Sequence, residues 1–237
     1  IFLVGDFTGM IGDPTDKLAT RKKLTREQVL ENAKSWRSQA EKLLDFSGDN
    51  PAKIMFNSEW SDKVTFRDLI EITSNLTVQQ MLERDMFQER LKANAPIYLH
   101  EFLYPMFQAY DAVTMDVDMQ VGGNDQTFNM LAGRTLMRKM NRKEKFVLAT
   151  KLLVDPTGKK MGKTEGNMVT LNDEPNEMFG KIMSWPDSLL LLAFEICTRL
   201  PLTEMVKLVE EKPKEAKMKL AHEIVRIYHN EEAAKEA

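Results

Sequence analysis

The feature that most constrains the fold is a short apolar run that leads directly into a glycine-rich loop at the start of the chain. Residues 1–4 read Ile-Phe-Leu-Val, and residues 5–15 contain three glycines and one proline. A continuous apolar run of this length is typical of a strand buried in a parallel sheet. Open α/β sheets bind ligands in the loops at the carboxyl ends of their strands. The pattern therefore predicts an α/β fold with a ligand site beside residues 5–15.

The glycine pattern narrows the class of ligand that this loop can hold. It does not match G-x-G-x-x-G, and the chain contains no G-x-x-x-x-G-K-[ST]. Neither a dinucleotide-binding loop nor a P-loop is therefore supported. Lys17 and Arg21 follow the loop four residues apart, so in a helix both cations lie on one face and form a positively charged arm.

A second glycine-containing loop carries two further cations. Residues 155–164 read Asp-Pro-Thr-Gly-Lys-Lys-Met-Gly-Lys-Thr, which places Lys160 and Lys163 three residues apart with the hydroxyl of Thr164 beside them. Ammonium groups are compact charges that bind phosphates, and glycines allow the backbone to approach a ligand closely. The segment fits a polyphosphate site, although a solvated basic turn explains it equally well when it is considered alone.

Three polar residues in the middle of the chain share a helical spacing. Tyr104, Gln108 and Asp111 follow an i, i+4, i+7 pattern, which puts them on one face of a helix where they can converge on a small polar ligand. Pro105 is best tolerated in a first turn, so the helix is predicted to begin near Tyr104. The alternative is that Tyr104 and Gln108 are ordinary half-buried polar residues.

A strand, a turn and a helix are predicted immediately afterwards. Residues 116–121 are typical of a strand, Gly122-Gly123 of a tight turn, and Asn124 of the N-cap of a helix from about 125 to 140. The free N–H groups of that helix would favour an anionic or hydroxyl-rich group. The alternative is that the glycine pair is only a turn.

The rest of the chain is predicted to be mainly helical. We expect a helix of about 20 residues capped by Thr25, a strand at 53–56, two or three short helices over 66–91 broken near residues 74–75, and a strand at 147–153. From about residue 175 the pattern is entirely helical, with breaks at Pro186, Pro201 and Pro213.

Composition excludes several classes of protein. No apolar run approaches 18 residues, and the start of the chain lacks signal-peptide features, so a cytoplasmic protein is expected. The single cysteine, Cys197, excludes internal disulfides, and the three histidines do not have metal-ligand spacing. A net charge of −3 argues against general nucleic-acid coating but is compatible with RNA binding through a local basic patch.

Taken together, these segments resemble the bacterial tyrosyl-tRNA synthetases, which are class I aminoacyl-tRNA synthetases. The likeness runs along nearly the whole chain, and the lysine loop corresponds to the KMSKS signature, with Gly162 and Thr164 at the serine positions. The HIGH signature is absent. The segments that carry the resemblance are GDFTGMIGDPTDKLATRKKLTREQVLENAK, FNSEW, MLERDMF, HEFLYPMFQAYD, QVGGNDQTFN, KKMGKTEGN and EPNEMFGKIMS.

The resemblance implies an architecture. The expected fold is a Rossmann-like parallel sheet in a catalytic domain over residues 1–173, with a helical insertion at about 58–100, followed by a small all-α domain over residues 174–237 that contacts the anticodon arm. The resemblance also identifies the chain as a fragment that lacks the N-terminal HIGH segment and the C-terminal RNA-binding domain. The fragment alone is therefore expected to be inactive.

The resemblance also implies site residues. Asp111 corresponds to the acceptor for the tyrosine phenol, and Thr8 lines the same pocket. Asp13, Tyr104 and Gln108, helped by Gln126, correspond to the ammonium site. Gly123 and Asp125 correspond to the ribose contact, and Lys163 also faces ATP. The implied catalytic residues are Lys160, Lys163, Thr164, Lys17 and Arg21.

The implied activity is that of a tyrosine–tRNA ligase, which activates L-tyrosine with ATP and then transfers it to tRNA(Tyr). ATP is a substrate, Mg²⁺ is expected to accompany it, and no protein metal site is predicted. A homodimer formed through the 58–100 insertion is expected, with Met81, Leu82, Met86 and Phe87 as candidate contacts unless they pack internally. The alternatives are a tryptophanyl-tRNA synthetase, another nucleotidyltransferase and a non-catalytic RNA-binding homologue.

Overall fold

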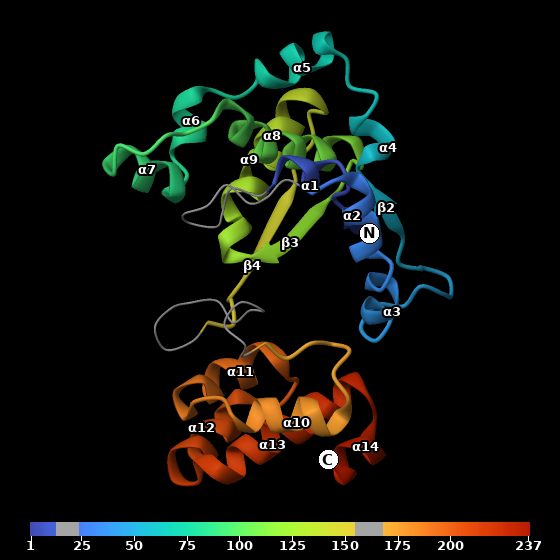
Figure 1. The fold of residues 1–237 in the computed structure, drawn as a ribbon, viewed down its shortest axis with the longest axis vertical. Coiled ribbons are helices and arrows are strands. Elements are labelled where there is room, and N and C mark those ends of the chain that lie inside the picture. Colours follow the sequence, from blue (N-terminus) through green and yellow to red (C-terminus); the bar gives the residue numbers. More distant parts are fainter. Residues whose placement is uncertain (13–23, 155–167) are drawn as a thin grey trace. The chain divides into compact units, whose positions relative to one another are not determined.

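The computed structural model describes residues 1–12, 24–154 and 168–237, which form two compact units (Figure 1). The first unit spans residues 1–150 and the second spans residues 151–237. The sequence placed the boundary between domains at 173/174. Residues just after 150 count with the second unit because Leu153 and Val169 pack against its helical core.

The described part of the first unit contains four strands, arranged as two parallel pairs. β1 (Phe2–Val4) pairs with β2 (Ile54–Phe56), and β3 (Met119–Gly123) pairs with β4 (Phe146–Thr150). Parallel pairing requires a crossover between the two strands of each pair. Between β3 and β4 that crossover is helical. The strands predicted at 1–4, 53–56, 116–121 and 147–153 are thus all present, and their parallel arrangement confirms the α/β fold class.

Two long helices, α8 (Leu99–Thr114) and α9 (Thr127–Met140), form the core of the first unit. Alanines on both helices are buried at their contact, which allows the two backbones to lie close together. The buried apolar residues of this cluster are Ile72, Ala109, Ala112, Val113, Ala132, Leu136 and Met137. The polar residues predicted to share one face therefore lie on a firmly packed helix.

α8 begins five residues before the predicted start, so Pro105 lies inside the helix and not in its first turn. The carboxylate of Glu101 explains the earlier start. Its Oε1 accepts a hydrogen bond from the backbone N–H of Tyr98 (3.1 Å), and its Oε2 forms a buried ion pair with Arg90 (2.6 Å). These contacts stabilise a turn of helix ahead of the proline, which cannot donate to the carbonyl of Glu101.

The prediction of a tight turn at Gly122-Gly123 was wrong. Both glycines belong to β3, where they pair with Ala149 and Thr150. Asn124 does not cap an α-helix but begins a short 3₁₀ segment, η1 (Asn124–Gln126), which leads into α9. The glycines extend the strand because β4 pairs with them, and Gly122 also packs closely on α9, where a Cβ would lie 3.2 Å from the sulfur of Met130.

The single helix predicted after Thr25 is divided into α2 (Arg26–Ala33) and α3 (Trp36–Ala40). Thr25 caps α2 as expected, since its hydroxyl accepts from the backbone N–H of Gln28 (3.3 Å). The break coincides with Ser35, whose hydroxyl accepts from Gln39 and whose carbonyl accepts from Ser38. Such local side-chain bonds compete with a continuous helix.

The short helices predicted over 66–91 are confirmed. α5 (Phe66–Thr73), α6 (Val78–Leu82) and α7 (Asp85–Lys92) follow α4 (Ser58–Ser61). Threonine side chains cap α5 and α6. The short helix α1 (Thr8–Ile11) follows β1.

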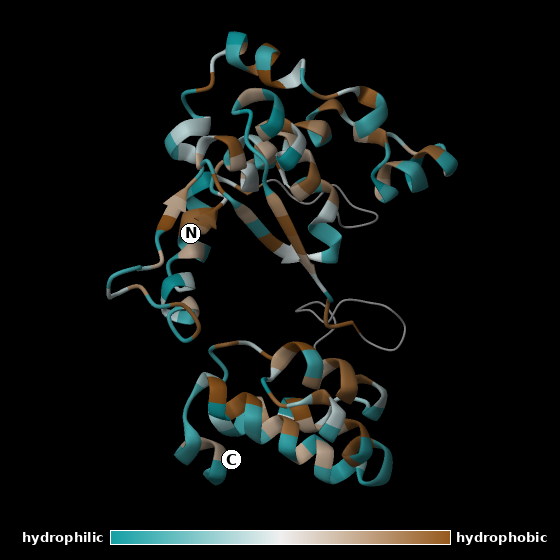
Figure 2. Ribbon diagram, turned by 180° about the vertical axis from the view of Figure 1, so that it is seen from behind, coloured by the Kyte–Doolittle hydropathy of each residue, from teal (hydrophilic) through white to brown (hydrophobic). Residues whose placement is uncertain are grey.

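In its described residues from 168 onward, the second unit is helical, as predicted, with prolines at the breaks. Its helices are α10 (Pro175–Met183), η3 (Asp187–Leu189), α11 (Leu190–Cys197), α12 (Leu202–Glu211), α13 (Pro213–Tyr228) and α14 (Glu231–Glu236). Hydrophobic and hydrophilic segments alternate along them (Figure 2), and the apolar sides meet in one core. Cys197 is half-buried beside this core, and burial raises its pKa to about 11. Across the described parts of both units, no helix combines the length and apolarity that crossing a bilayer requires.

Candidate functional site

A buried carboxylate on α8 forms the centre of the candidate site. Asp111 is 2% exposed, its Oδ1 accepts from Trp60 Nε1 (2.8 Å) and its Oδ2 accepts from Asn57 Nδ2 (3.1 Å). Burial raises the pKa of Asp111 to about 6, and the negative charge of Asp6 acts in the same direction. The two hydrogen bonds oppose that rise because they stabilise the ionised form.

The glycine loop after β1 lies against this carboxylate. Thr8 is buried at the start of α1, and its hydroxyl oxygen accepts from Asn57 Nδ2 (3.0 Å), the same amide nitrogen that reaches Asp111. Gly5 makes the turn possible, since a Cβ there would lie 2.5 Å from the Thr8 hydroxyl oxygen. Phe7 packs on Phe107 of α8, with ring centroids 4.8 Å apart. The structure therefore brings Thr8 and Asp111 together, as predicted.

Asn57 and Trp60 were assigned no role from the sequence, although a signal for Asn57 exists. β1 and β2 are parallel and in register, with Val4 opposite Phe56, so both strands end at the same edge of the sheet. The residue after β2 must consequently lie beside the loop after β1. Asn57 is that residue. Trp60 follows one turn later on α4, and no sequence pattern pointed to it.

A second polar group lies between α8 and the start of α9. Gln108 Nε2 donates to Gln126 Oε1 (3.5 Å), which also accepts from Asn129 Nδ2 (2.9 Å), and Gln126 Nε2 donates to Asp125 Oδ2 (3.4 Å). Among the described residues, the buried Oε1 of Gln108 has no hydrogen-bond partner. A buried acceptor left open on a helix face is the kind of group that a ligand donor satisfies. Asn129, which is fully buried, was not predicted from the sequence.

The remaining predicted residues are partly described. Tyr104 is half-buried on α8, and Gly123 and Asp125 are half-buried where β3 passes into η1. Asp13, Lys17, Arg21, Lys160, Lys163 and Thr164 lie outside the described residues. The structure therefore describes the positions of the predicted tyrosine-binding groups on α8 but not those of the predicted phosphate-binding groups.

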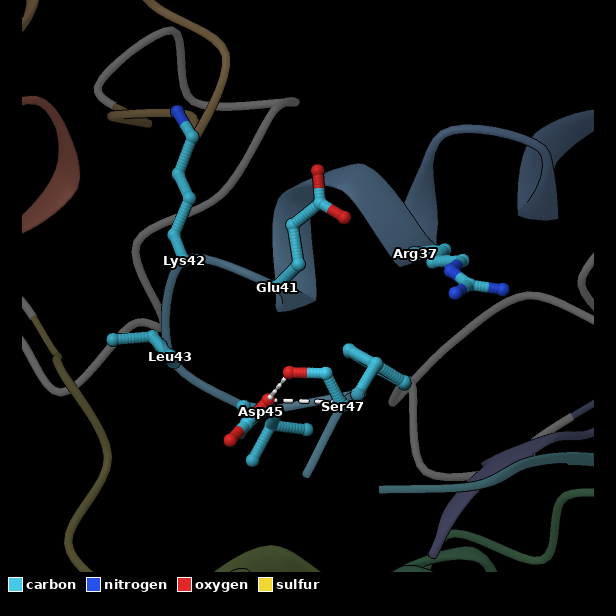
Figure 3. A pocket seen from close by; sticks show the side chains of 8 residues that line it. Arg37, Glu41, Lys42, Leu43, Asp45 and Ser47 are labelled. Atoms are coloured by element: carbon cyan, nitrogen blue, oxygen red, sulfur yellow. Dashed lines mark hydrogen bonds between the residues drawn. The ribbon is translucent and has the colours of Figure 1, made fainter. Parts of the chain in front are cut away.

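A separate hollow of about 620 Å³ lies in the loop that follows α3 (Figure 3). Arg37, Glu41, Lys42 and Leu43 line it together with Asp45, which accepts two hydrogen bonds from Ser47. Of the predicted site residues that the structure describes, none lines this hollow. Over the ranges 1–12, 24–154 and 168–237 the structure also holds no group of three or more side chains suited to binding a metal ion.

Comparisons with known proteins agree with this arrangement. The family model described as tRNA synthetases class I (W and Y) matches residues 1–237. The tyrosine–tRNA ligase of Carboxydothermus hydrogenoformans is 46% identical over 246 residues, which cover 100% of this chain and 59% of the relative. That of Haemophilus influenzae is 44% identical and is covered to 60%. The chain thus spans about three fifths of the length of these relatives.

Solved structures share the fold at low sequence identity. A C-terminally truncated mitochondrial tyrosyl-tRNA synthetase of Aspergillus nidulans superposes with a TM-score of 0.72 at 21% identity, over 99% of this chain and 73% of the other. A tyrosyl-tRNA synthetase of Archaeoglobus fulgidus, complexed with L-tyrosine, gives 0.70 at 18% identity, over 99% and 78%. With the family model matched from end to end, the chain belongs to the class I tRNA synthetases of the tryptophan and tyrosine group.

Proposed function

We propose that this chain is part of a tyrosine–tRNA ligase, which converts L-tyrosine and ATP to tyrosyl-adenylate and pyrophosphate and then transfers tyrosine to tRNA(Tyr) in the cytoplasm. The observation that carries the proposal is the buried carboxylate of Asp111, which accepts from two fixed donors beside the carboxyl ends of β1 and β2. Relatives 43–46% identical to the chain bear the name tyrosine–tRNA ligase, which supports the same reading.

The phenol of tyrosine is proposed to donate its hydrogen to Asp111. Each oxygen of this carboxylate already accepts one hydrogen bond, and an ionised carboxylate has about four acceptor sites in all. The described residues therefore leave one acceptor site per oxygen for a ligand. Burying a carboxylate is costly unless its acceptors are used, so a hydroxyl donor is favoured at this position over a hydrogen atom.

The ammonium group of tyrosine is proposed to bind one turn earlier on α8. Gln108 presents a buried carbonyl oxygen that has no partner among the described residues, and Gln126 is held beside it by Asn129. Tyr104 and Asp13 would complete the site. On this arrangement, Thr8 lines the pocket beside Asp111 and thereby limits its width.

ATP is proposed to lie across the ends of the strands, with its ribose at Gly123 and Asp125. Its phosphates would lie among Lys160, Lys163, Thr164, Lys17 and Arg21. In the activation step the tyrosine carboxylate attacks the α-phosphorus, and the bond to the bridging oxygen breaks so that pyrophosphate leaves with the electron pair. The protein supplies no nucleophile. It positions the substrates and stabilises the charge that develops on the leaving group, while Mg²⁺ arrives with ATP.

Transfer RNA is proposed to contact the helical region, residues 174–237 of the sequence-based division, with residues 1–173 acting as the catalytic domain. A homodimer through the 58–100 insertion is also proposed. Of its candidate contacts, Met81, Met86 and Phe87 are 7% exposed or less and therefore pack internally. The exposed apolar side chains of the same region are better placed for a partner, and these are Phe66, Ile70, Val78, Leu91, Tyr98 and Leu99.

The proposal is tested by amino-acid-dependent ATP–pyrophosphate exchange with the full-length protein. Tyrosine should support exchange, and the exchange rates with phenylalanine and with tryptophan should be far lower. Asp111→Ala should lower kcat/KM for tyrosine at least tenfold more than for phenylalanine, because only tyrosine loses a hydrogen bond to a charged acceptor. Exchange that tryptophan supports better than tyrosine would favour the tryptophanyl alternative. If none of the amino acids supports exchange, a non-catalytic RNA-binding homologue would be favoured.

A further inference from the structure

The side chain of Asn57 has only one orientation compatible with its neighbours. Its Oδ1 accepts from the backbone N–H of Phe7 (2.8 Å), which can only donate. The amide nitrogen must then face the other way, where it donates to Thr8 Oγ1 (3.0 Å) and Asp111 Oδ2 (3.1 Å). Both of its N–H groups and its oxygen are used, and the residue is completely buried. Asn57 is thereby fixed as a donor toward Asp111.

The second donor to Asp111 comes from the same segment. Trp60, on the first turn of α4, donates its indole N–H to Oδ1 (2.8 Å), and an indole nitrogen can act only as a donor. One fixed donor on each oxygen prevents the carboxylate from rotating freely. Within the described parts of the chain, one acceptor site on each oxygen is left for a ligand.

The segment that carries both donors is itself anchored to β1 and the loop after it. The backbone N–H of Asn57 donates to the carbonyl of Val4 (3.1 Å), and the backbone N–H of Ser58 donates to Asp6 Oδ1 (3.0 Å). With the bond from Phe7, three hydrogen bonds hold residues 57–58 in place. Residues 57–60 are therefore a rigid support for the carboxylate.

We propose that Asn57 and Trp60 are positioning residues, which hold Asp111 as an oriented hydrogen-bond acceptor and thereby set how strongly the site prefers a ligand hydroxyl to a hydrogen atom. This inference rests on the proposed function, in which that hydroxyl is the phenol of tyrosine. It extends that function to two side chains that do not need to touch the substrate.

The support also determines the pH range in which Asp111 acts as an acceptor. Burial raises its pKa to about 6, and Asp6, the charged residue that faces it from the end of β1, raises it as well. The bonds from Trp60 and Asn57 lower it. Removal of either donor should therefore raise the pKa further, so that Asp111 becomes protonated at a higher pH and loses acceptor capacity there.

The test compares Trp60→Phe with Trp185→Phe in the full-length protein. Both changes remove one indole N–H and keep an aromatic ring, but Trp185 is buried in the second unit and its Nε1 has no hydrogen-bond partner among the described residues. In Trp60→Phe, kcat/KM for tyrosine in pyrophosphate exchange at pH 7 should fall roughly tenfold or more, while kcat/KM for phenylalanine stays unchanged. The pH at which tyrosine activation is half lost should move upward. Trp185→Phe should alter neither quantity.

A second variant removes the other donor, and in both variants an unchanged kcat/KM for phenylalanine is the check that the protein is still folded. Asn57→Asp keeps the acceptor for Phe7 but replaces the donor to Asp111 with a second acidic group, so it should reduce tyrosine activation more than Trp60→Phe and shift its pH dependence further. An unchanged preference and pH profile in Trp60→Phe, or equal losses for tyrosine and phenylalanine, would overturn the inference alone. A wild-type protein that activates no tyrosine would remove the proposed function and this inference with it.

Discussion

The two units of this chain bury different kinds of side chain. In the described part of the second unit, the buried residues are apolar apart from Asp173 and Glu223, and both of these pair with side chains of their own helical region. The described part of the first unit buries many more polar groups. These are Asp6, Thr8, Asn57, Ser61, Arg84, Glu101, Asp111, Asn129 and Lys145.

The difference separates residues that stabilise a fold from residues that prepare a site. A polar group is buried at a cost unless it is paired, so a unit that buries many of them gives up stability for chemistry or for fixed geometry. In the first unit, Glu101 is paired with Arg90 and serves the structure. Asp111 instead keeps acceptor capacity among the described residues, as does the half-buried Gln108 beside it on α8, and these are the groups that the proposed function turns toward a ligand.

The largest expected effect on stability lies in the second unit, whose core is mainly apolar. Phe194 is completely buried on α11, and Phe194→Ala should destabilise the second unit by about 3–5 kcal/mol, because the lost burial is accompanied by a cavity. Hydrogen exchange of amides in each unit measures the two stabilities separately. Met218→Ala, at a half-exposed position on α13, should change stability by no more than about 0.5 kcal/mol. Equal effects of the two substitutions would show that the apolar core does not dominate this unit.

The second prediction concerns the free-energy cost of a buried cation in the first unit. Lys145 is 2% exposed, it donates to Gln120, and burial followed by the charge of Arg134 lowers its pKa from 10.5 to about 8. The folded state therefore holds this proton less tightly than the unfolded state. The stability that Lys145 contributes is fully present above about pH 10.5 and is lost as the pH falls through about 8.

Lys145→Met removes this dependence. As the pH is lowered from about 10.5 to 7, the stability of the variant relative to wild type should rise by up to about 3 kcal/mol, measured by urea unfolding at each pH. Lys143→Met provides the control, because hydrogen bonding to Asp118 raises the pKa of Lys143 and the trend with pH should be reversed. If the difference in stability between Lys145→Met and wild type does not change with pH, burial does not lower the pKa of Lys145 in the folded protein.

The sequence predicted the parts of this site that depend on local pattern. The apolar run at 1–4 with its glycine loop, and the helical spacing of Gln108 and Asp111, predicted the strand, the loop and the helix that carry Thr8, Gln108 and Asp111. It failed where a contact distant in the chain decided the outcome. α8 starts early because Glu101 meets Arg90, and Gly122 and Gly123 form the end of a strand because β4 pairs with them. Trp60 could not be found because only the tertiary fold brings its indole to Asp111, 51 residues further along the chain.

The prediction with the smallest expected effect tests whether the first unit unfolds as one cooperative body. Thr65 caps α5: its hydroxyl accepts from the backbone N–H of Asp68 (3.2 Å), and the Asp68 carboxylate accepts from the backbone N–H of Thr65 (2.8 Å). Thr65→Ala should cost about 1 kcal/mol, since both the cap and the reciprocal bond depend on this turn. Thr73→Ala, in the last turn of the same helix, should be nearly neutral because alanine favours the helix and the lost bond goes only to a carbonyl one turn back.

Hydrogen exchange is again the measurement. If the amides of α5 alone exchange faster in Thr65→Ala, the 58–100 region opens independently of the site, and the rigid support of Asp111 by residues 57–60 ends where α5 begins. If the amides of β1 and α8 are affected to the same extent, the whole first unit is one cooperative body, and its buried polar groups are stabilised together.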